Sequence, residues 1–426
     1  MGLKDTASLA LIPAAYKTSK IYSALPTDGD GDFTFTRSGN ATRVNKAGLV
    51  ETMGTNIGRL NYDLINGTPA SCPSLLLEPS RTNKQIYSQE LSNSAYLKVG
   101  STVTADQTTA PDGTLTADKV QRNTTSASYL RDDIYESTNG YYYSSSFFIK
   151  KGNCDRVAFR LQTNYPDRYD VRFVFSTENV EYNATAGDMT NGSYNIVKYN
   201  NGWYRIELTA KTASDNTAIV PMLSPRVSAG NVDSSDTSSD AFCYSWGWQT
   251  ETSGNTSSSY PTSYIPTTSA AVTRTADSCG DAGNSTIIKA EGSLFVDFTT
   301  SNTDNFKRIY IISNSDFNNA IFIQLLGSSF AVQVVSGGTT LYSWGFAITL
   351  LDRHKIALRY KDGDSQLYYN GIQQTAATTA GTWFSEGLLN KFTFSPSGFF
   401  NFYGEINQAM VFNEALTDSE LQTLTS

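Results

Sequence analysis

Apolar and polar residues alternate in short stretches along most of this chain, and this pattern constrains the fold more than any other feature. Successive side chains of a β-strand point to opposite faces, so alternation predicts strands with one buried face. The stretches lie at 157–161, 171–175, 204–208, 242–248, 294–298, 321–325, 330–334 and 356–360. Helix-period runs are nearly absent. The sequence therefore predicts an all-β protein of antiparallel strands.

The length of the chain predicts more than one domain. With 426 residues it is too long for one ordinary core and suits two or three domains. Over residues 1–83 we expect an N-terminal region with an attachment arm and a hairpin formed by 33–37 and 48–52. Two antiparallel β-sandwiches, a jelly roll over 84–278 and a concanavalin A-like domain over 279–426, are expected to follow.

Local signals near the end of the chain are more explicit. The dipeptides Asp362-Gly363 and Asn370-Gly371 are typical of tight turns between antiparallel strands. Thr417 stands three residues before Glu420 and precedes Leu421, a spacing that forms a capping box. We therefore expect a strand meander that ends in one short C-terminal helix.

Charge and hydropathy argue against two classes of partner. Only 17% of the residues are charged, the formal net charge is −8, and no Lys/Arg cluster occurs, so nucleic acid is not expected. No stretch approaches the ~20 consecutive apolar residues of a membrane span. Residues 1–20 lack the pattern of a signal peptide. We expect a protein that is made in a cytoplasm and binds neither nucleic acid nor membrane.

A single histidine, His354, limits the chemistry open to this chain. Any Ser-His-Asp triad, Cys-His pair or multi-histidine metal site would have to include it, and its place in an alternating strand favours a structural role. The cysteines form no CxxC pair and are expected to be isolated buried thiols; they are Cys72, Cys154, Cys243 and Cys279. We expect no enzyme, no resident metal and no cofactor. Asp362 and Asp364 could contribute to a structural Ca²⁺.

Several segments resemble parts of bacteriophage fibre and appendage proteins. Those that open the chain and frame its middle are Phe33 to Ser38, Ala41 to Val44, Arg59 to Tyr62, Ser74 to Asn83, Tyr260 to Ser269 and Thr273 to Asp277. A further set resembles concanavalin A-like, laminin-G-type domains and comprises His354 to Leu358, Leu367 to Gly371, Gly404 to Ile406 and Phe412 to Thr417. Together these segments span nearly the whole chain.

The resemblance implies a virion component that is made in the host bacterial cytoplasm and ends on the virion surface. It implies a virion-attachment region, a carbohydrate-binding-module-like jelly roll and a lectin-like C-terminal domain. A homo-oligomer is expected, and fibres are often trimers, although no heptad segment enforces one. The function expected is that of a head- or tail-fibre protein that binds host-surface polysaccharide. The alternatives are a capsid-decorating protein without ligand and a polysaccharide depolymerase that uses a carboxylate pair.

Exposed aromatic side chains are the expected glycan contacts, because their flat faces stack on sugar rings. The candidates are Trp203, Tyr142, Trp344 and Trp383. Trp203 alternates with Tyr204 and is therefore expected on the outward face of its strand. Trp246 and Trp248 share a face by alternation, which favours a place in the core.

The segment before Pro26 carries apolar residues with little neighbouring sequence to cover them. They are Leu9, Leu11, Ile12, Ile21 and Leu25. We expect this arm to attach the protein to other virion chains through these side chains.

Overall fold

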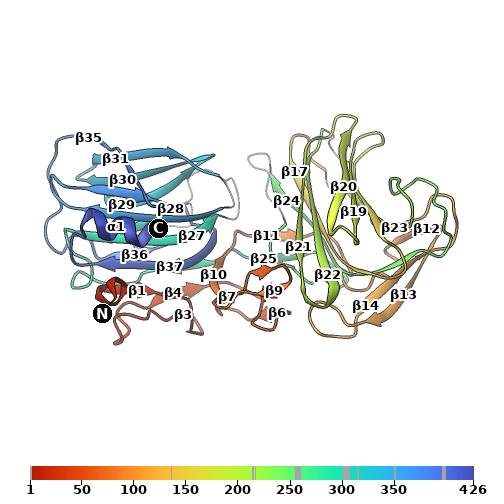
Figure 1. The fold of residues 1–426 in the computed structure, drawn as a ribbon, viewed down its shortest axis with the longest axis horizontal. Coiled ribbons are helices and arrows are strands. Elements are labelled where there is room, and N and C mark those ends of the chain that lie inside the picture. The colour runs from red at the N-terminus through yellow and green to blue at the C-terminus, as the bar shows by residue number, and fades with distance from the viewer. Residues whose placement is uncertain are drawn as a thin grey trace.

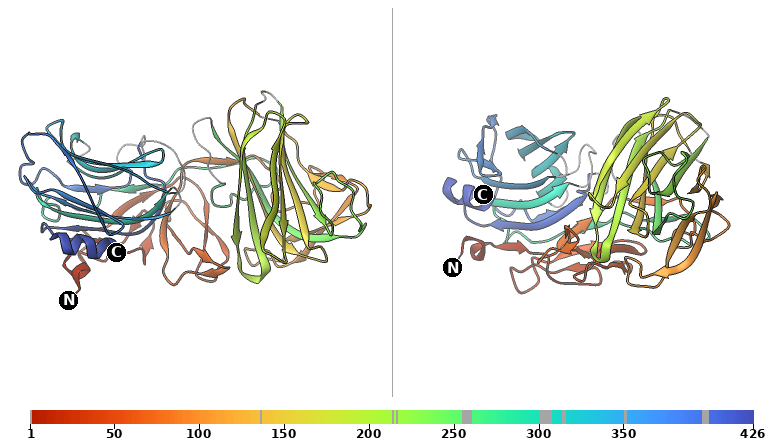
Figure 2. Two further views of the ribbon diagram at one scale, coloured as in Figure 1. Left: turned by 45° about the horizontal axis from the view of Figure 1, so that its top comes forward. Right: turned by 45° about the vertical axis from the view of Figure 1, so that its right-hand side comes forward.

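The computed structural model describes residues 2–135, 137–213, 215, 217–254, 261–300, 308–313, 316–349, 352–395 and 400–426. Figure 1 shows two β-sandwiches beside each other, with the N-terminal segment (red to orange) running from one to the other. Both chain ends lie on the C-terminal sandwich, as the further views in Figure 2 also show. Strands dominate, so the prediction of an all-β fold with two antiparallel sandwiches is confirmed.

The central sandwich consists of two antiparallel sheets. One sheet has the order β12-β15-β23-β18-β19-β20, with β16 paired to β23. Its strands are β12 (Leu97–Val99), β15 (Tyr129–Arg131), β16 (Ile134–Tyr135), β18 (Arg156–Gln162), β19 (Arg168–Val174), β20 (Asn179–Ala186) and β23 (Ala218–Arg226). The other sheet has the order β13-β14-β24-β17-β22-β21. Its strands are β13 (Ser101–Thr108), β14 (Ala117–Arg122), β17 (Tyr142–Lys151), β21 (Thr190–Lys198), β22 (Trp203–Lys211) and β24 (Phe242–Gly254).

Alternation builds the core between these two sheets. Val157, Phe159 and Leu161 of β18 are fully buried there, whereas the residues between them face away from the core. The rings of Phe147 and Trp248, from the opposite sheet, meet edge to face at 4.8 Å between centroids. Such aromatic pairs add to the stability gained by burying their apolar area.

The C-terminal sandwich is also two-layered. Its larger sheet has the order β34-β33-β32-β27-β37-β10-β7, with β1 also paired to β37. These strands are β1 (Leu9–Leu11), β7 (Arg59–Asn61), β10 (Ser74–Leu77), β27 (Gly292–Thr300), β32 (Arg353–Tyr360), β33 (Gln366–Tyr369), β34 (Ile372–Gln374) and β37 (Gly404–Phe412). The smaller sheet has the order β35-β31-β30-β29-β28-β36. Its strands are β28 (Arg308–Ser313), β29 (Asp316–Leu326), β30 (Ser329–Ser336), β31 (Thr339–Ala347), β35 (Ala377–Thr378) and β36 (Lys391–Thr393).

The N-terminal segment is part of the C-terminal sandwich and not a free arm. Strand β1 pairs with the last part of β37, and β10 pairs with its first part. Leu9, Leu11 and Ile21 are fully buried in the core of this sandwich, and Leu25 packs against a neighbouring cluster. Only Ile12 of the five predicted attachment residues is largely exposed, at 41%. The expectation that these side chains lack cover within their own chain is therefore wrong.

The expected hairpin of 33–37 with 48–52 is also wrong in its pairing, although both strands exist. β4 (Phe33–Thr36) pairs with β3 and with a strand from far along the chain, whereas β6 (Val50–Met53) pairs with β5 (Ala41–Val44). The four-stranded sheet that contains β4 has the order β2-β3-β4-β26. Its other strands are β2 (Tyr16–Lys17), β3 (Lys20–Ile21) and β26 (Ser278–Gly280).

Two further strand pairs lie around the junction of the sandwiches. They are β8 (Leu64–Ile65) with β9 (Thr68–Pro69), and β11 (Arg81–Asn83) with β25 (Val272–Arg274). The second pair joins the segment that enters the central sandwich to the segment that leaves it. The two ends of the central sandwich are thus held next to each other where the domain joins the rest of the chain.

Helices are short. The predicted C-terminal helix is α1 (Asp418–Thr425), and the capping box of Thr417 with Glu420 is confirmed. Two 3-10 turns, η1 (Leu3–Thr6) and η2 (Asn200–Gly202), complete the helical structure of the described residues. Among all the residues that the structure describes, no helix has the length and apolar character needed to cross a membrane.

Candidate binding site at the domain junction

A buried ion cluster lies where the N-terminal segment meets both sandwiches. Arg59, on β7, forms ion pairs with Glu78 and with Asp277. Arg37 pairs with the same Asp277 at 3.1 Å, and Arg274, on β25, pairs with Glu78 at 2.7 Å. The three guanidinium groups have no exposed surface. Three arginines and two carboxylates thus share one buried network.

The network keeps the carboxylate of Glu78 charged. Burial on its own would raise the pKa of Glu78, but Arg274 and Arg59, with hydrogen bonds from Ser263, hold that pKa well below its usual range. Asp277 and Glu78 together raise the pKa of Arg59 in spite of its complete burial. Removing one partner of such a network leaves an unpaired buried charge, which costs about 3–5 kcal/mol.

The segment that leaves the central sandwich is fixed on this cluster. The backbone N–H and the hydroxyl of Ser263 donate to Glu78 at 2.7 and 2.6 Å. Thr42 donates to the carbonyl of the next residue, Tyr264, at 2.5 Å. The phenol of Tyr264 is in turn hydrogen-bonded to Ser88 at 2.6 Å. These bonds hold the exit segment against the N-terminal region.

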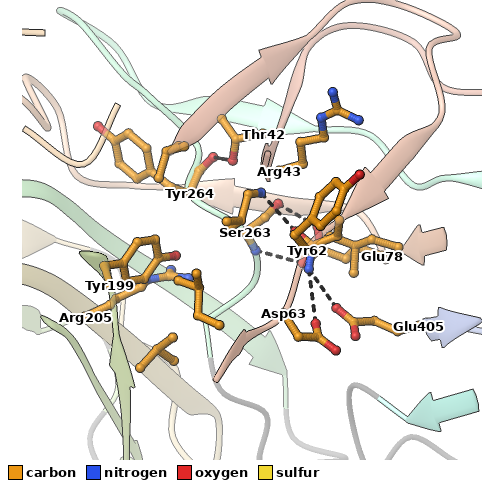
Figure 3. Close-up of a pocket in the computed structure, with 16 residues that line it drawn as sticks. Thr42, Arg43, Tyr62, Asp63, Glu78, Tyr199, Arg205, Ser263, Tyr264 and Glu405 are labelled. Carbon is orange, nitrogen blue, oxygen red and sulfur yellow. Dashed lines mark hydrogen bonds between the residues drawn. The ribbon is translucent and has the colours of Figure 1, made fainter. Parts of the chain in front are cut away.

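A cavity of about 230 Å³ opens next to the cluster and is lined by residues from all three parts of the chain. Three tyrosines, Tyr62, Tyr199 and Tyr264, supply aromatic surface. Its polar residues are Thr42, Arg43, Asn61, Asp63, Glu78, Arg205, Ser263 and Glu405. In Figure 3 Asp63 and Glu405 lie next to each other, with Tyr199 and Arg205 on the opposite side of the view.

Asp63 and Glu405 form a carboxyl pair at one wall of this pocket. Asn61 donates its side-chain amide to Glu405 Oε1 at 2.9 Å. The pKa of Glu405 is raised well above its usual value by burial, by the charge of Asp63 and by a hydrogen bond to that residue. Glu405 therefore keeps its proton to a higher pH than a solvated glutamate does. The pair offers a ligand several carboxyl oxygen atoms at one wall of the pocket.

The spacing of this pair bears on the hydrolase alternative. Retaining glycosidases hold their two carboxyl groups about 5–5.5 Å apart, and inverting enzymes about 6.5–9.5 Å apart. The side-chain amide of Asn61 lies 2.9 Å from Glu405 Oε1 and 3.5 Å from Asp63 Oδ1. One amide nitrogen that reaches both groups leaves no room for a sugar ring between them, so this pair suits hydrogen bonding to a ligand better than cleavage of one.

The opposite wall comes from the central sandwich. Arg205, on β22, pairs with Glu207 at 3.2 Å and donates to the carbonyl of Thr262 at 2.8 Å. Burial raises the pKa of Tyr199 to about 12, so its phenol stays protonated and can donate. At the rim, Arg43 pairs with Glu51 at 2.8 Å. The wall presents donors that are already held in position by their own chain.

Two of the predicted glycan contacts do not face solvent. Trp203 lies on the outer face of its sheet, as predicted, but that face is covered by the N-terminal region, and its indole N–H donates to the carbonyl of Thr109 at 3.0 Å. Trp344 lies in the core of the C-terminal sandwich, stacked on Tyr342. With exposures of 1% and 0%, neither tryptophan reaches the surface, so the prediction that these two are exposed glycan contacts is wrong.

The other two candidates lie nearer the surface, in different domains. Tyr142 is partly exposed; its hydroxyl accepts from the amide of Asn191 at 2.7 Å, and the ammonium of Lys211 lies 5.7 Å from its ring centre. Trp383 is partly exposed and donates to the carbonyl of Ala290 at 2.9 Å. The four candidates are not brought together, and glycan contact by Tyr142 and Trp383 stays a prediction.

The junction pocket was not expected from the sequence. Its residues carry no pattern of their own, because they come from positions as far apart as Thr42 and Glu405. One signal was present: Arg59 to Tyr62, Ser74 to Asn83 and residues 261–269, which were expected to frame the central domain, all contribute to the pocket or to its ion cluster.

Metal binding finds no support among the described residues, where no group of three or more His, Cys, Asp or Glu side chains is placed to hold an ion. Asp364, which was considered for calcium, instead accepts from Arg359 at 2.8 Å.

Fold and junction together define a class: an all-β protein of two β-sandwiches that share a buried ion cluster and a polar pocket. No family model and no curated protein matches this chain. Among solved structures it is similar to the CBM40 domain of the Ruminococcus gnavus IT-sialidase bound to α2,3-sialyllactose. That similarity has 14% identity and a TM-score of 0.29, over 34% of this chain and 94% of that one.

Two other structures show similarity of the same order. One is the leech intramolecular trans-sialidase complexed with 2,7-anhydro-Neu5Ac, at 14% identity and a TM-score of 0.27, over 32% of this chain and 23% of that one. The other is the LG4-5 domains of the mouse laminin α1 chain, at 10% identity and a TM-score of 0.24, over 83% and 95%. Values this low assign no function, which must be argued from the geometry of this chain.

Proposed function

We propose that this chain is a bacteriophage virion structural protein, a head- or tail-fibre or appendage component, that binds host-surface glycan in its junction pocket. One observation carries the proposal. The segments that resemble phage fibre proteins meet at the junction, where they line a pocket of tyrosine, carboxyl, amide and guanidinium groups.

The chemistry of the pocket suits a sugar. Saccharides present hydroxyl groups that need fixed donors and acceptors, and C–H faces that stack on aromatic rings. Asn61, Asp63 and Glu405 supply hydrogen-bond donors and acceptors on one wall. Tyr62 lies beside them as an aromatic surface. A volume of about 230 Å³ is below the ~300–1,000 Å³ typical of drug-sized ligand sites. We therefore expect one terminal sugar residue of a longer glycan to enter.

Attachment to the virion is also part of the proposal, but through another surface than the five N-terminal residues named from the sequence. Leu9, Leu11 and Ile21 are buried within the chain, so they are not free to contact another protein. Ile12 is exposed next to them, and both chain ends lie on the C-terminal sandwich. We place the attachment surface there, with a homo-oligomer, trimeric in many fibres, as the expected assembly.

A glycan array with the complete chain tests the proposal against its alternatives. Binding of a defined set of bacterial surface glycans, without release of reducing ends on longer incubation, is the expected result. Release of reducing ends would overturn it in favour of a depolymerase. If antibodies label the protein on particles but it binds no polysaccharide of the phage's own host, the proposal is overturned. The protein would then be a decorating protein without ligand.

A further inference from the structure

Two of the four cysteines lie against each other inside the central sandwich. Cys154 is in the turn between β17 and β18, and Cys243 is near the start of β24; both have 0% exposure. The backbone N–H of Cys154 donates to the carbonyl of Phe242 at 3.3 Å, and Lys151 pairs with Cys243 across the sheet. Residues that are almost 90 positions apart in sequence are thus neighbours.

The turn that carries Cys154 is fixed on strand β24 by its other residues. Asn153 accepts from the backbone N–H of Phe242 at 2.7 Å and donates to the carbonyl of Asp240 at 3.2 Å. At Gly152 any Cβ would lie 2.3 Å from the ring of Phe242, so only glycine permits this approach. The relative position of the two cysteines is therefore set by backbone contacts and does not depend on their thiols.

Both cysteine side chains lie in the same hydrophobic cluster between the sheets. The backbone of Cys154 is hydrogen-bonded to Phe242, the residue directly before Cys243, so the two chain segments approach within one hydrogen bond where the thiols meet the core. Burial raises the pKa of Cys243 well above its usual value, and the neighbouring thiol of Cys154 raises it further. A disulfide requires two segments this close, with Cα atoms 4.4–6.8 Å apart. The other two cysteines are elsewhere: Cys72 is exposed, and Cys279 lies in the core of the C-terminal sandwich.

We propose that Cys154 and Cys243 form an intramolecular disulfide when the protein folds in, or is transferred to, an oxidising thiol–disulfide environment. Such transfer outside a reducing cytoplasm rests on the proposed function, whereas the pairing rests on the geometry alone. With glutathione disulfide as oxidant, two S–H bonds are lost and one S–S bond forms. The two electrons and two protons convert the oxidant into two molecules of glutathione.

The crosslink would stabilise the central sandwich. It closes a loop of roughly 90 residues, and long loops gain most from closure because the unfolded chain loses more freedom. We expect the thermal midpoint to rise by about 5–10 °C. Both thiols are buried, and the raised pKa of Cys243 disfavours its reactive thiolate, so oxidation of the folded protein is slow and is best observed after refolding.

Refolding the complete chain in a glutathione redox buffer, followed by alkylation in denaturant without reductant, tests the pairing. We expect two alkylated residues, Cys72 and Cys279, and one linked peptide pair that contains Cys154 and Cys243. The variant Cys72→Ser should keep the rise in thermal midpoint, and Cys243→Ser should lose it.

Alkylation of all four cysteines in the refolded wild-type chain, or a link that includes Cys72 or Cys279, would overturn the proposal. This mapping needs no variant, so a misfolded Cys243→Ser protein does not affect it. Glycan binding measured on the same oxidised and reduced samples separates the two proposals. A chain that binds no glycan still reports its disulfide by mass.

Discussion

Glu405 shows how one residue at the junction couples stability to pH. Its pKa in the folded chain is raised well above 4.5 by burial and by Asp63. The folded state therefore keeps a proton that the unfolded state releases, and the free energy of unfolding falls as pH rises from about 4.5 through the folded pKa. The loss arises because two ionised carboxylates would then share one site.

Glu405→Gln should remove this dependence, because the amide does not ionise and its oxygen can still accept from Asn61. We expect the thermal midpoint of the variant to exceed that of the wild type by a few degrees at pH 8 and to match it near pH 4.5. Glu414→Gln, at an exposed glutamate, is the matched control and should leave the profile unchanged. Equal profiles for Glu405→Gln and the wild type would contradict a raised pKa of Glu405.

His354 supports a structural role at the residue scale. It is 1% exposed, lies between the rings of Phe298 and Phe330, and its Nδ1 is 3.1 Å from the hydroxyl of Tyr369. Burial lowers its pKa to about 4. As the pH falls, the imidazole of the unfolded chain is protonated near pH 6.5, before that of the folded chain. The contribution of His354 to stability is therefore complete above about pH 6.5 and is lost toward pH 4.

The pKa of His354 can be measured without assignment, because the chain has one histidine. We expect its imidazole resonances in an NMR titration to stay those of the neutral ring down to about pH 5 and to change near pH 4. A midpoint near 6.5, the value of a solvated imidazole, would show that the ring is not buried as described.

At the scale of elements, the sequence predicted what local chemistry decides. The turns at Asp362-Gly363 and Asn370-Gly371 are present, and Gly363, Asn370 and Gly371 have φ of 69°, 44° and 79°, the left-handed region that these residue types favour. The helix capped by Thr417 is also present. These signals need no distant partner, which is why they could be predicted.

A bulge in β24 shows where such reasoning fails. Alternation placed Trp246 and Trp248 on one face, yet Trp248 lies in the core between the sheets and Trp246 lies on the outer face. Gly247, with φ of 60°, stands at a register shift between β17 and β24 and puts these neighbours on opposite faces. A single extra residue reverses the faces, and alternation alone does not reveal it.

Two neighbouring residues of the N-terminal segment allow a matched test of whether β1 packs on the C-terminal sandwich. Leu9 is fully buried beside β37, whereas Ile12, one residue beyond the strand, is 41% exposed. We expect Leu9→Ala to lower the free energy of unfolding of the C-terminal sandwich by about 2–5 kcal/mol. Ile12→Ala should lower it by about 1 kcal/mol or less. Equal effects in denaturant titrations would mean that β1 is not docked.

At the scale of the whole molecule, the junction depends on contacts that no stretch of sequence contains. Arg37 and Asp277 are 240 positions apart, and Asn61 and Glu405 are 344 apart, yet both pairs are in contact. The strands were predictable from their own residues, but the convergence of β7, β10, β25 and β37 follows only from the complete fold. The pocket therefore could not be derived from composition or spacing.

The ion cluster should dominate the stability of this junction. Asp277→Asn leaves two buried arginines without their shared carboxylate, and we expect a loss of about 3–5 kcal/mol. Asp281→Asn is the control: this nearby aspartate, 60% exposed, pairs with Lys391 at 3.0 Å, and its loss should cost at most about 1 kcal/mol. Similar midpoints for both variants in denaturant unfolding would contradict a structural role for the cluster.

The central claim is that the junction pocket binds glycan, and a titration of the best array glycan against three proteins tests it most directly. Tyr62 lines the pocket, whereas Tyr165, 68% exposed, lies outside it in the loop between β18 and β19. We predict that Tyr62→Ala weakens binding in calorimetry by roughly tenfold or more, as the loss of one stacking face implies. Tyr165→Ala should bind as the wild type does. Unchanged affinity in Tyr62→Ala would contradict the account.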